Sequence, residues 1–121
     1  MATGVKHVLI VEDEKALARV LENKLKHEGL VTKVVGNGRD AMEALNSGQY
    51  DVMLLDMMMP VMDGFKVLEN LHTLAKKPIT FALSNLSLHD DQDRVLGMGA
   101  RKYFIKSETP LDVIVQEVKN A

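Results

Sequence analysis

Five short apolar runs recur along the chain, and each is followed by a stretch whose apolar residues recur every three or four positions. The runs cover residues 6–11, 31–35, 52–56, 79–84 and 102–105. Short runs rich in β-branched residues are typical of strands buried on both faces, and the stretches between them are typical of amphipathic helices. This alternation predicts an α/β fold, a doubly wound parallel sheet of five strands with helices on both faces.

Turn and capping residues mark where the helices begin and end. We expect the first two helices to end at Gly29 and Gly48, the third to end before Pro78, the fourth to begin near Ser87 and Asp90 and to end near Gly97 or Gly99, and the last to begin with Thr109 as N-cap and Pro110 at the first helical position.

Length and composition predict one ordinary globular domain. The chain has 121 residues, of which 46% are hydrophobic and 26% charged, so we expect residues 1–121 to form a single domain. The absence of cysteine excludes disulfides and thiolate metal sites, and it favours an intracellular, cytoplasmic protein. A net charge of -2 leaves no basic surface for nucleic acid, and no apolar stretch is long enough to span a membrane.

Carboxylates follow two of the predicted strands at the point where each strand ends. Glu12 and Asp13 come after the first strand, and Asp56 is the last residue of the third. Ligands of doubly wound sheets bind outside the carboxyl ends of the strands. Carboxylates gathered there repel one another, and a divalent cation would resolve the repulsion. Oxygen ligands with room for water suit Mg²⁺.

Two further strand ends carry groups that suit a phosphoryl group. Ser84 ends the fourth strand with a hydroxyl, and Lys106 follows the fifth strand with a cation. An aspartate can attack phosphorus and form an acyl phosphate when a metal and a lysine neutralise the charge. The sequence therefore predicts that Asp56 is a phosphoacceptor.

The whole pattern resembles the receiver domain of two-component response regulators. The family pattern D-x-x-M-P-x-M-D-G stands here as DMMMPVMDG from Asp56 to Gly64. The residues that match the family's functional positions are the acid pair Glu12 and Asp13, the phosphorylated Asp56, the metal-ligating main-chain carbonyl of Met58, the catalytic Ser84 and Lys106, and the switch pair Ser84 and Tyr103. The resemblance also implies a flavodoxin-like strand order, 2-1-3-4-5.

The resemblance implies a signalling switch rather than a turnover enzyme. Asp56 would take a phosphoryl group from the phosphohistidine of a sensor histidine kinase or a phosphotransfer protein, with Mg²⁺, in a self-catalysed reaction that self-catalysed hydrolysis reverses. Tyr103 would follow Ser84 inward and remodel the face formed by the fourth helix, the fifth strand and the fifth helix. That face would contact an output protein or domain, or a second copy of the chain.

Three departures from the family pattern concern the loops around the site. Ser107 stands where the family has a proline after a cis bond, and we predict a trans bond because a cis bond before a non-proline residue is costly. Asn85 is larger than the usual Ala or Gly and is expected to narrow the approach of a phosphodonor. Met58 and Leu86 are both apolar and offer no group to orient water, which predicts a long-lived phosphoryl group.

Three alternatives to a phosphorylated receiver were weighed. A Toprim-like Mg²⁺ nuclease or primase fragment would need a second aspartate two residues after Asp56, where Met58 stands. A flavodoxin-like FMN carrier would need phosphate donors after the first strand, where Glu12, Asp13 and Glu14 would repel phosphate. A receiver-like interaction module that acts without phosphorylation remains open, because of Asn85 and Ser107.

Overall fold

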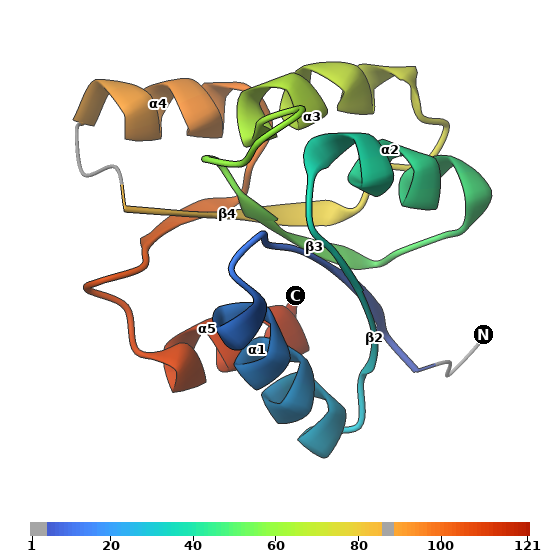
Figure 1. Cartoon of the computed structure of the whole chain (residues 1–121), viewed down its shortest axis with the longest axis vertical. Helices are drawn as coiled ribbons and strands as arrows, with labels where there is room; N and C mark the ends of the chain where they lie inside the picture. The colour runs from blue at the N-terminus through green and yellow to red at the C-terminus, as the bar shows by residue number, and fades with distance from the viewer. Residues whose placement is uncertain (1–4, 86–88) are drawn as a thin grey trace.

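A parallel sheet of five strands lies between two layers of helices (Figure 1). The structure is a computed structural model that describes residues 5–85 and 89–121. The strands are β1 (His7–Val11), β2 (Val31–Val35), β3 (Val52–Asp56), β4 (Ile79–Ser84) and β5 (Lys102–Ile105). Their order in the sheet is β2-β1-β3-β4-β5. The α/β class, the flavodoxin-like order and the five predicted strands are confirmed.

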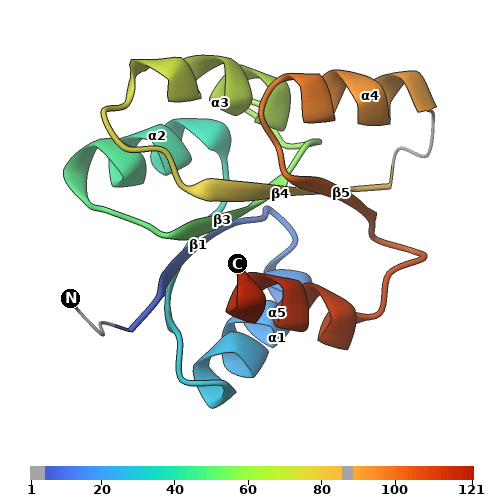
Figure 2. The ribbon, with the colours of Figure 1, turned by 180° about the vertical axis from the view of Figure 1, so that it is seen from behind.

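The helices cover both faces of the sheet, as predicted. They are α1 (Lys15–His27), α2 (Gly38–Ser47), α3 (Gly64–Asn70), α4 (His89–Gly97) and α5 (Leu111–Asn120), with a 3₁₀ turn η1 (Leu71–Thr73) after α3. Figures 1 and 2 show α2, α3 and α4 on one face and α1 and α5 on the other. No helix within the described residues is long and apolar enough to cross a bilayer.

Each face of the sheet contributes to its own hydrophobic core. Leu9, Met53 and Leu55 pack toward α2, α3 and α4, whereas Ile10 and Leu54 pack toward α1 and α5. Alternate residues of one strand point to opposite faces, so β3 is buried along its whole length. The end of β3 is therefore held rigidly, and Asp56 with it.

The edge strand β2 differs from the prediction of a strand buried on both faces. Its residues are exposed or half-buried, and Val31 is 45% exposed. The cause is the strand order, because β2 pairs with β1 alone and has no neighbour on its other side. The apolar pattern of a run shows that it is a strand but does not show its place in the sheet.

The last helix begins one residue later than predicted. Pro110 is the N-cap of α5, and its carbonyl accepts a hydrogen bond from Ile114 N–H. Thr109 is not the N-cap, because its N–H donates to the Ile105 carbonyl in the turn after β5. The predicted start of α4 at Ser87 lies outside the described residues, and its predicted end at Gly97 is confirmed. No described peptide bond is cis, so the trans bond before Ser107 is confirmed.

The loop between β3 and α3 is folded tightly against its surroundings. A Cβ atom at Gly64 would lie 2.7 Å from Met57 Cα and 2.8 Å from the Asp56 carbonyl oxygen, so only glycine fits there. On the other side of the loop, Gly38 N–H donates to the Met62 carbonyl. These anchors hold Val61 in the left-handed region at φ 70°, where a β-branched residue is strained.

We predict that Val61→Asn raises the free energy of unfolding by about 1 kcal/mol, because asparagine tolerates the left-handed region better than valine. Val61 is 71% exposed, so the substitution loses little apolar burial. Urea denaturation followed by circular dichroism measures the effect.

The matched control is Val113→Asn, at a 45% exposed position within α5. Valine and asparagine have similar helix propensities, so this change is expected to stay within about 0.5 kcal/mol. A Val61→Asn protein that is no more stable than the Val113→Asn protein would contradict the strain at Val61.

Candidate functional site

Three carboxylates meet at the carboxyl edge of the sheet, as predicted. Val11 of β1 lies opposite Leu55 of β3, so the residues that follow them, Glu12 and Asp56, leave the sheet side by side. One carboxylate oxygen from each of Glu12, Asp13 and Asp56 lies within 4.8 Å of the other two. Glu12 and Asp56 are each 2% exposed, whereas Asp13 is exposed. The cluster is therefore buried on one side and open to solvent on the other.

Lys106 reaches into this cluster from the end of β5. Its Nζ donates a hydrogen bond to Asp56 Oδ2 at 3.2 Å and lies 2.7 Å from Glu12 Oε1. The lysine backbone is held in place because its N–H donates to the Ser84 carbonyl at 2.8 Å. The structure thus brings the predicted lysine into direct contact with two of the three predicted acids.

The Glu12 carboxylate has one oxygen with a hydrogen-bond donor and one without. Oε2 accepts the main-chain N–H of Glu14 at 3.0 Å. Oε1 is buried and receives no hydrogen bond within the described part of the chain, because the nearby Lys106 ammonium forms an ion pair with it but is not aligned as a donor. An oxygen in this state retains capacity for a further positive ligand.

Asp56 is held from both sides, and its acidity is strongly altered. Oδ1 accepts the Met58 N–H at 3.0 Å, and Oδ2 accepts from Lys106. Burial, reinforced by the Glu12 carboxylate, raises the pKa of Asp56 to about 7, although the Met58 hydrogen bond and Lys106 act in the opposite direction. Protonated and ionised forms of Asp56 are therefore close in free energy at neutral pH.

Lys106 remains charged in this environment. Burial acts to lower the pKa of its ammonium, but the carboxylates of Glu12 and Asp56 outweigh burial, and the net shift is upward. One cation thus stands against three carboxylates, which leaves the cluster with a negative excess.

The donor set of the cluster fits a hard divalent cation. All the groups are carboxylates, one of them retains a buried oxygen without a hydrogen bond, and Asp13 lies on the solvent side where water can complete a coordination shell. Cations such as Mg²⁺ prefer oxygen ligands and keep several waters. The negative excess left by Lys106 would be neutralised by such an ion.

The predicted switch residues lie beside the cluster. Ser84 is fully buried at the end of β4, one residue beyond Leu83, which lies opposite Asp56. Tyr103 of β5 is half-buried against the core under α2, α3 and α4. Burial raises the pKa of the Tyr103 phenol, and the Ser84 side chain acts to lower it. Ser84 and Tyr103 are therefore neighbours.

The loop residues named in the sequence analysis have different outcomes. The Met58 side chain is 57% exposed, while its N–H is bound to Asp56. Asn85 is exposed just beyond β4, and its effect on a phosphodonor stays a prediction. Leu86 lies outside the described residues.

Some features of the site were not predicted from the sequence. The main-chain N–H of Glu14 fixes Glu12, and the Arg94 guanidinium of α4 lies 4.3 Å from the centroid of the Phe65 ring of α3. Neither contact has a sequence signal, because a main-chain donor has no residue type and the ring contact joins distant segments. Gly64 had a signal, its place in the DMMMPVMDG stretch, but its close approach to Met57 is visible only in three dimensions.

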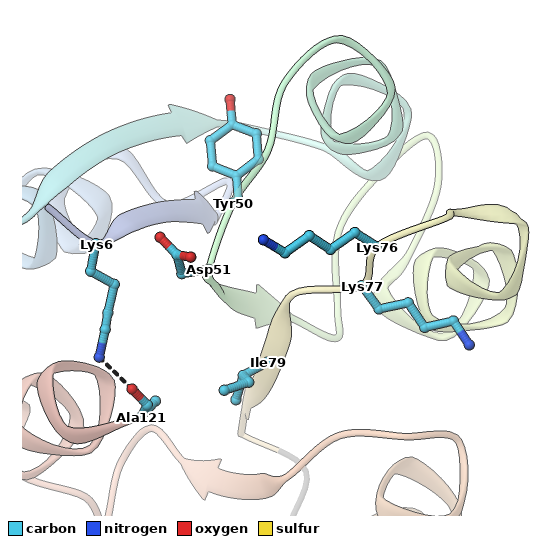
Figure 3. Close-up of a pocket in the computed structure, with 7 residues that line it drawn as sticks. All are labelled: Lys6, Tyr50, Asp51, Lys76, Lys77, Ile79 and Ala121. Atoms are coloured by element: carbon cyan, nitrogen blue, oxygen red, sulfur yellow. Dashed lines mark hydrogen bonds between the residues drawn. The ribbon is translucent and has the colours of Figure 1, made fainter. Parts of the chain in front are cut away.

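A pocket of about 350 Å³ lies at the opposite edge of the sheet (Figure 3). Its residues are Lys6, Tyr50, Asp51, Lys76, Lys77, Ile79 and Ala121. Lys6 Nζ donates to main-chain carbonyls at the end of α5, including that of Ala121, and Lys77 points away from the pocket in Figure 3. This pocket is separated from Asp56 by the length of β3 and has no part in the acidic cluster.

Comparison with known proteins agrees with this geometry. The family model of the response regulator receiver domain matches residues 8–119. The transcriptional regulatory protein PcoR of Escherichia coli is 35% identical over 103 residues, which cover 84% of this chain and 45% of that protein. YkoG of Bacillus subtilis, an uncharacterized transcriptional regulatory protein, is 37% identical over 103 residues, which cover 83% of this chain and 44% of the other. The chain spans about half the length of such curated relatives.

Solved structures give the same result. The receiver domain of the Francisella response regulator 1452 has a TM-score of 0.89 and 28% identity, and the match covers 95% of this chain and 94% of that one. The response regulator TrrA of Thermotoga maritima, solved in complex with Mg(2+)-BeF, has a TM-score of 0.82 and 28% identity, covering 96% and 98% of the two chains. The fold, the acidic cluster with its lysine, and the family match over residues 8–119 agree, and the chain belongs to the response regulator receiver domain family of two-component systems.

Proposed function

We propose that Asp56 accepts a phosphoryl group from the phosphohistidine of a sensor histidine kinase or a phosphotransfer protein. The observation that carries the proposal is the contact of Lys106 Nζ with both Asp56 Oδ2 and Glu12 Oε1 at an edge where three carboxylates gather. A buried carboxylate beside a lysine and further acids is the arrangement that transfer to an aspartate requires.

The chemical step follows from the contacts of Asp56. The ionised carboxylate attacks phosphorus, the P–N bond breaks, and its electron pair returns to the imidazole, which takes up a proton from solvent. Lys106 then exchanges its contact with Asp56 Oδ2 for a contact with a phosphoryl oxygen. The Ser84 hydroxyl, at the end of the neighbouring strand, donates to a second phosphoryl oxygen.

The residues proposed to hold Mg²⁺ are Glu12, Asp13, Asp56 and the main-chain carbonyl of Met58. When bound, the ion would supply positive charge against the carboxylates and the incoming phosphoryl oxygens. The support for this assignment is the negative excess of the cluster and the free capacity of Glu12 Oε1.

The same proposal includes an output response. Ser84 and Tyr103 are neighbours, and Asp91 of α4 also influences the Tyr103 phenol, so a movement of Ser84 toward the phosphoryl group would be felt by β5 and α4. We infer that the face of α4, β5 and α5 contacts an output protein or domain, or a second copy of the chain. We also propose that residues 1–121 act as one receiver unit.

The first test is phosphorylation by acetyl phosphate with Mg²⁺, read by intact-protein mass spectrometry. We predict one phosphoryl adduct on the unmodified sequence and none on Asp56→Asn, because the amide is a poor nucleophile. The control is Asp51→Asn, the same change at the opposite end of β3, where the carboxylate accepts the His7 N–H. Absence of the adduct from all three proteins would favour an interaction module that works without phosphorylation.

The second test is the pH dependence of Asp56. Since burial raises its pKa from 3.8 to about 7, the carboxyl is protonated below pH 7 in the absence of a cation. Binding of Mg²⁺ must displace that proton, so the dissociation constant for Mg²⁺ is expected to fall about tenfold per pH unit as the pH rises toward 7, and to level off above it.

Isothermal titration calorimetry across this pH range measures the constant, and ¹³C NMR of the Asp56 carboxyl measures the proton directly. In Asp56→Asn the dependence near pH 7 is expected to disappear. An NMR midpoint near the ordinary aspartate value without Mg²⁺ would contradict the burial of an uncompensated carboxyl.

A further inference from the structure

Met58 differs from every other methionine in the described part of the chain. Its side chain is 57% exposed. The others are buried in, or packed against, the core under α2, α3 and α4, and they are Met42, Met53, Met57, Met59, Met62 and Met98. Oxidation of methionine by peroxides depends on access to the sulfur, so Met58 is the methionine of this set that an oxidant in solution reaches first.

Met58 is also the methionine tied directly to the proposed phosphoacceptor. Its N–H donates to Asp56 Oδ1 at 3.0 Å. The backbone on either side is held, because Met57 N–H donates to the Leu83 carbonyl and Gly64 N–H donates to the Met57 carbonyl. A change in the Met58 side chain therefore takes place at a fixed position beside the Asp56 carboxylate.

We propose that Met58 is a site of reversible oxidation by hydroperoxides, and that its sulfoxide shortens the lifetime of the phosphoryl group on Asp56. The effect on lifetime rests on the proposed function of Asp56, whereas the oxidation itself does not. In the step, a sulfur lone pair attacks one peroxide oxygen, the S–O bond forms and the O–O bond breaks. Sulfur loses two electrons, and the peroxide is reduced to water or, for an organic peroxide, to an alcohol.

The sulfoxide changes what the loop offers to water. A thioether is a weak hydrogen-bond acceptor, so the unmodified side chain covers the approach to Asp56 without ordering solvent. A sulfoxide oxygen is polar and accepts hydrogen bonds from water. Water held beside the acyl phosphate is placed to attack phosphorus, and hydrolysis becomes faster.

The first measurement is the rate of oxidation at each methionine. The full chain is treated with limiting hydrogen peroxide, quenched at intervals and digested, and the sulfoxide at each position is quantified by mass spectrometry. Met58 is expected to be oxidised at least about fivefold faster than the half-buried Met59 and Met98, because access to the sulfur controls the rate. Equal rates at these positions would overturn the proposal.

The second measurement is the phosphoryl half-life before and after peroxide treatment, with the ratio taken for each protein separately. The unmodified sequence is expected to show a shortening of about threefold or more, which methionine sulfoxide reductase reverses. Met58→Leu removes the sulfur and is expected to give a ratio near one. Met98→Leu, at a half-buried methionine after α4, is the control and is expected to respond like the unmodified sequence.

A second variant keeps the test independent of oxidant damage. Met58→Gln places a polar acceptor of similar length at this position, and without peroxide it is expected to have a shorter half-life than Met58→Leu. An unchanged ratio for the unmodified sequence, or an equal change in Met58→Leu, would overturn the effect on lifetime alone. If the untreated protein forms no adduct, the proposed function of Asp56 fails, and the effect on lifetime fails with it.

Discussion

The contact of the Lys106 ammonium with Glu12 and Asp56 is the interaction on which the rest of the site depends. Two carboxylates with 2% exposure cannot both remain ionised side by side without a nearby positive charge. Lys106 provides that charge across the width of the sheet, from β5 to β1 and β3. It does so only in part, because the Asp56 pKa is still raised to about 7. The remaining imbalance prepares the site for a cation and a phosphoryl group.

The fold determines the geometry of this contact through rigid elements rather than through the loops. β3 is buried along its length between two cores, so its last residue has little freedom. Gly64 lets α3 begin close to the Met57 backbone, and the strained Val61 marks how tightly the loop must turn. Strain of this kind is common where a backbone is held for function. The loop thus brings the Met58 N–H to Asp56 Oδ1.

The strands were predicted well because each is short, apolar and bounded by turn residues. The predicted bounds of β2, β3, β4 and β5 agree with the structure, and β1 begins one residue later than expected. The start of α5 was misplaced because Thr109 and Pro110 are both good starting residues and only the tertiary turn after β5 decides between them. The exposure of β2 was not predicted, since it follows from strand order and not from the run itself.

The candidate site was predicted as a set of strand ends, and that set does come together for Glu12, Asp13, Asp56 and Lys106. The sequence could not show that Lys106 contacts Glu12 as well as Asp56, because this depends on side-chain conformation. It also could not show that Met58 is exposed while Met57 beside it is buried, since adjacent residues of a loop have no fixed periodicity. Family resemblance named the residues, and packing determined their environment.

The most direct measurement is an experimental structure of the protein with Mg²⁺ and beryllium fluoride, a mimic of the phosphoryl group. The account predicts the fluoride complex on an Asp56 oxygen, with Lys106 Nζ moved from Glu12 Oε1 to a fluorine and Ser84 Oγ in contact with another. If Lys106 stayed on Glu12 and Asp56 carried no beryllium under conditions in which a known receiver domain reacts, the proposed role of this lysine and of Asp56 would be contradicted.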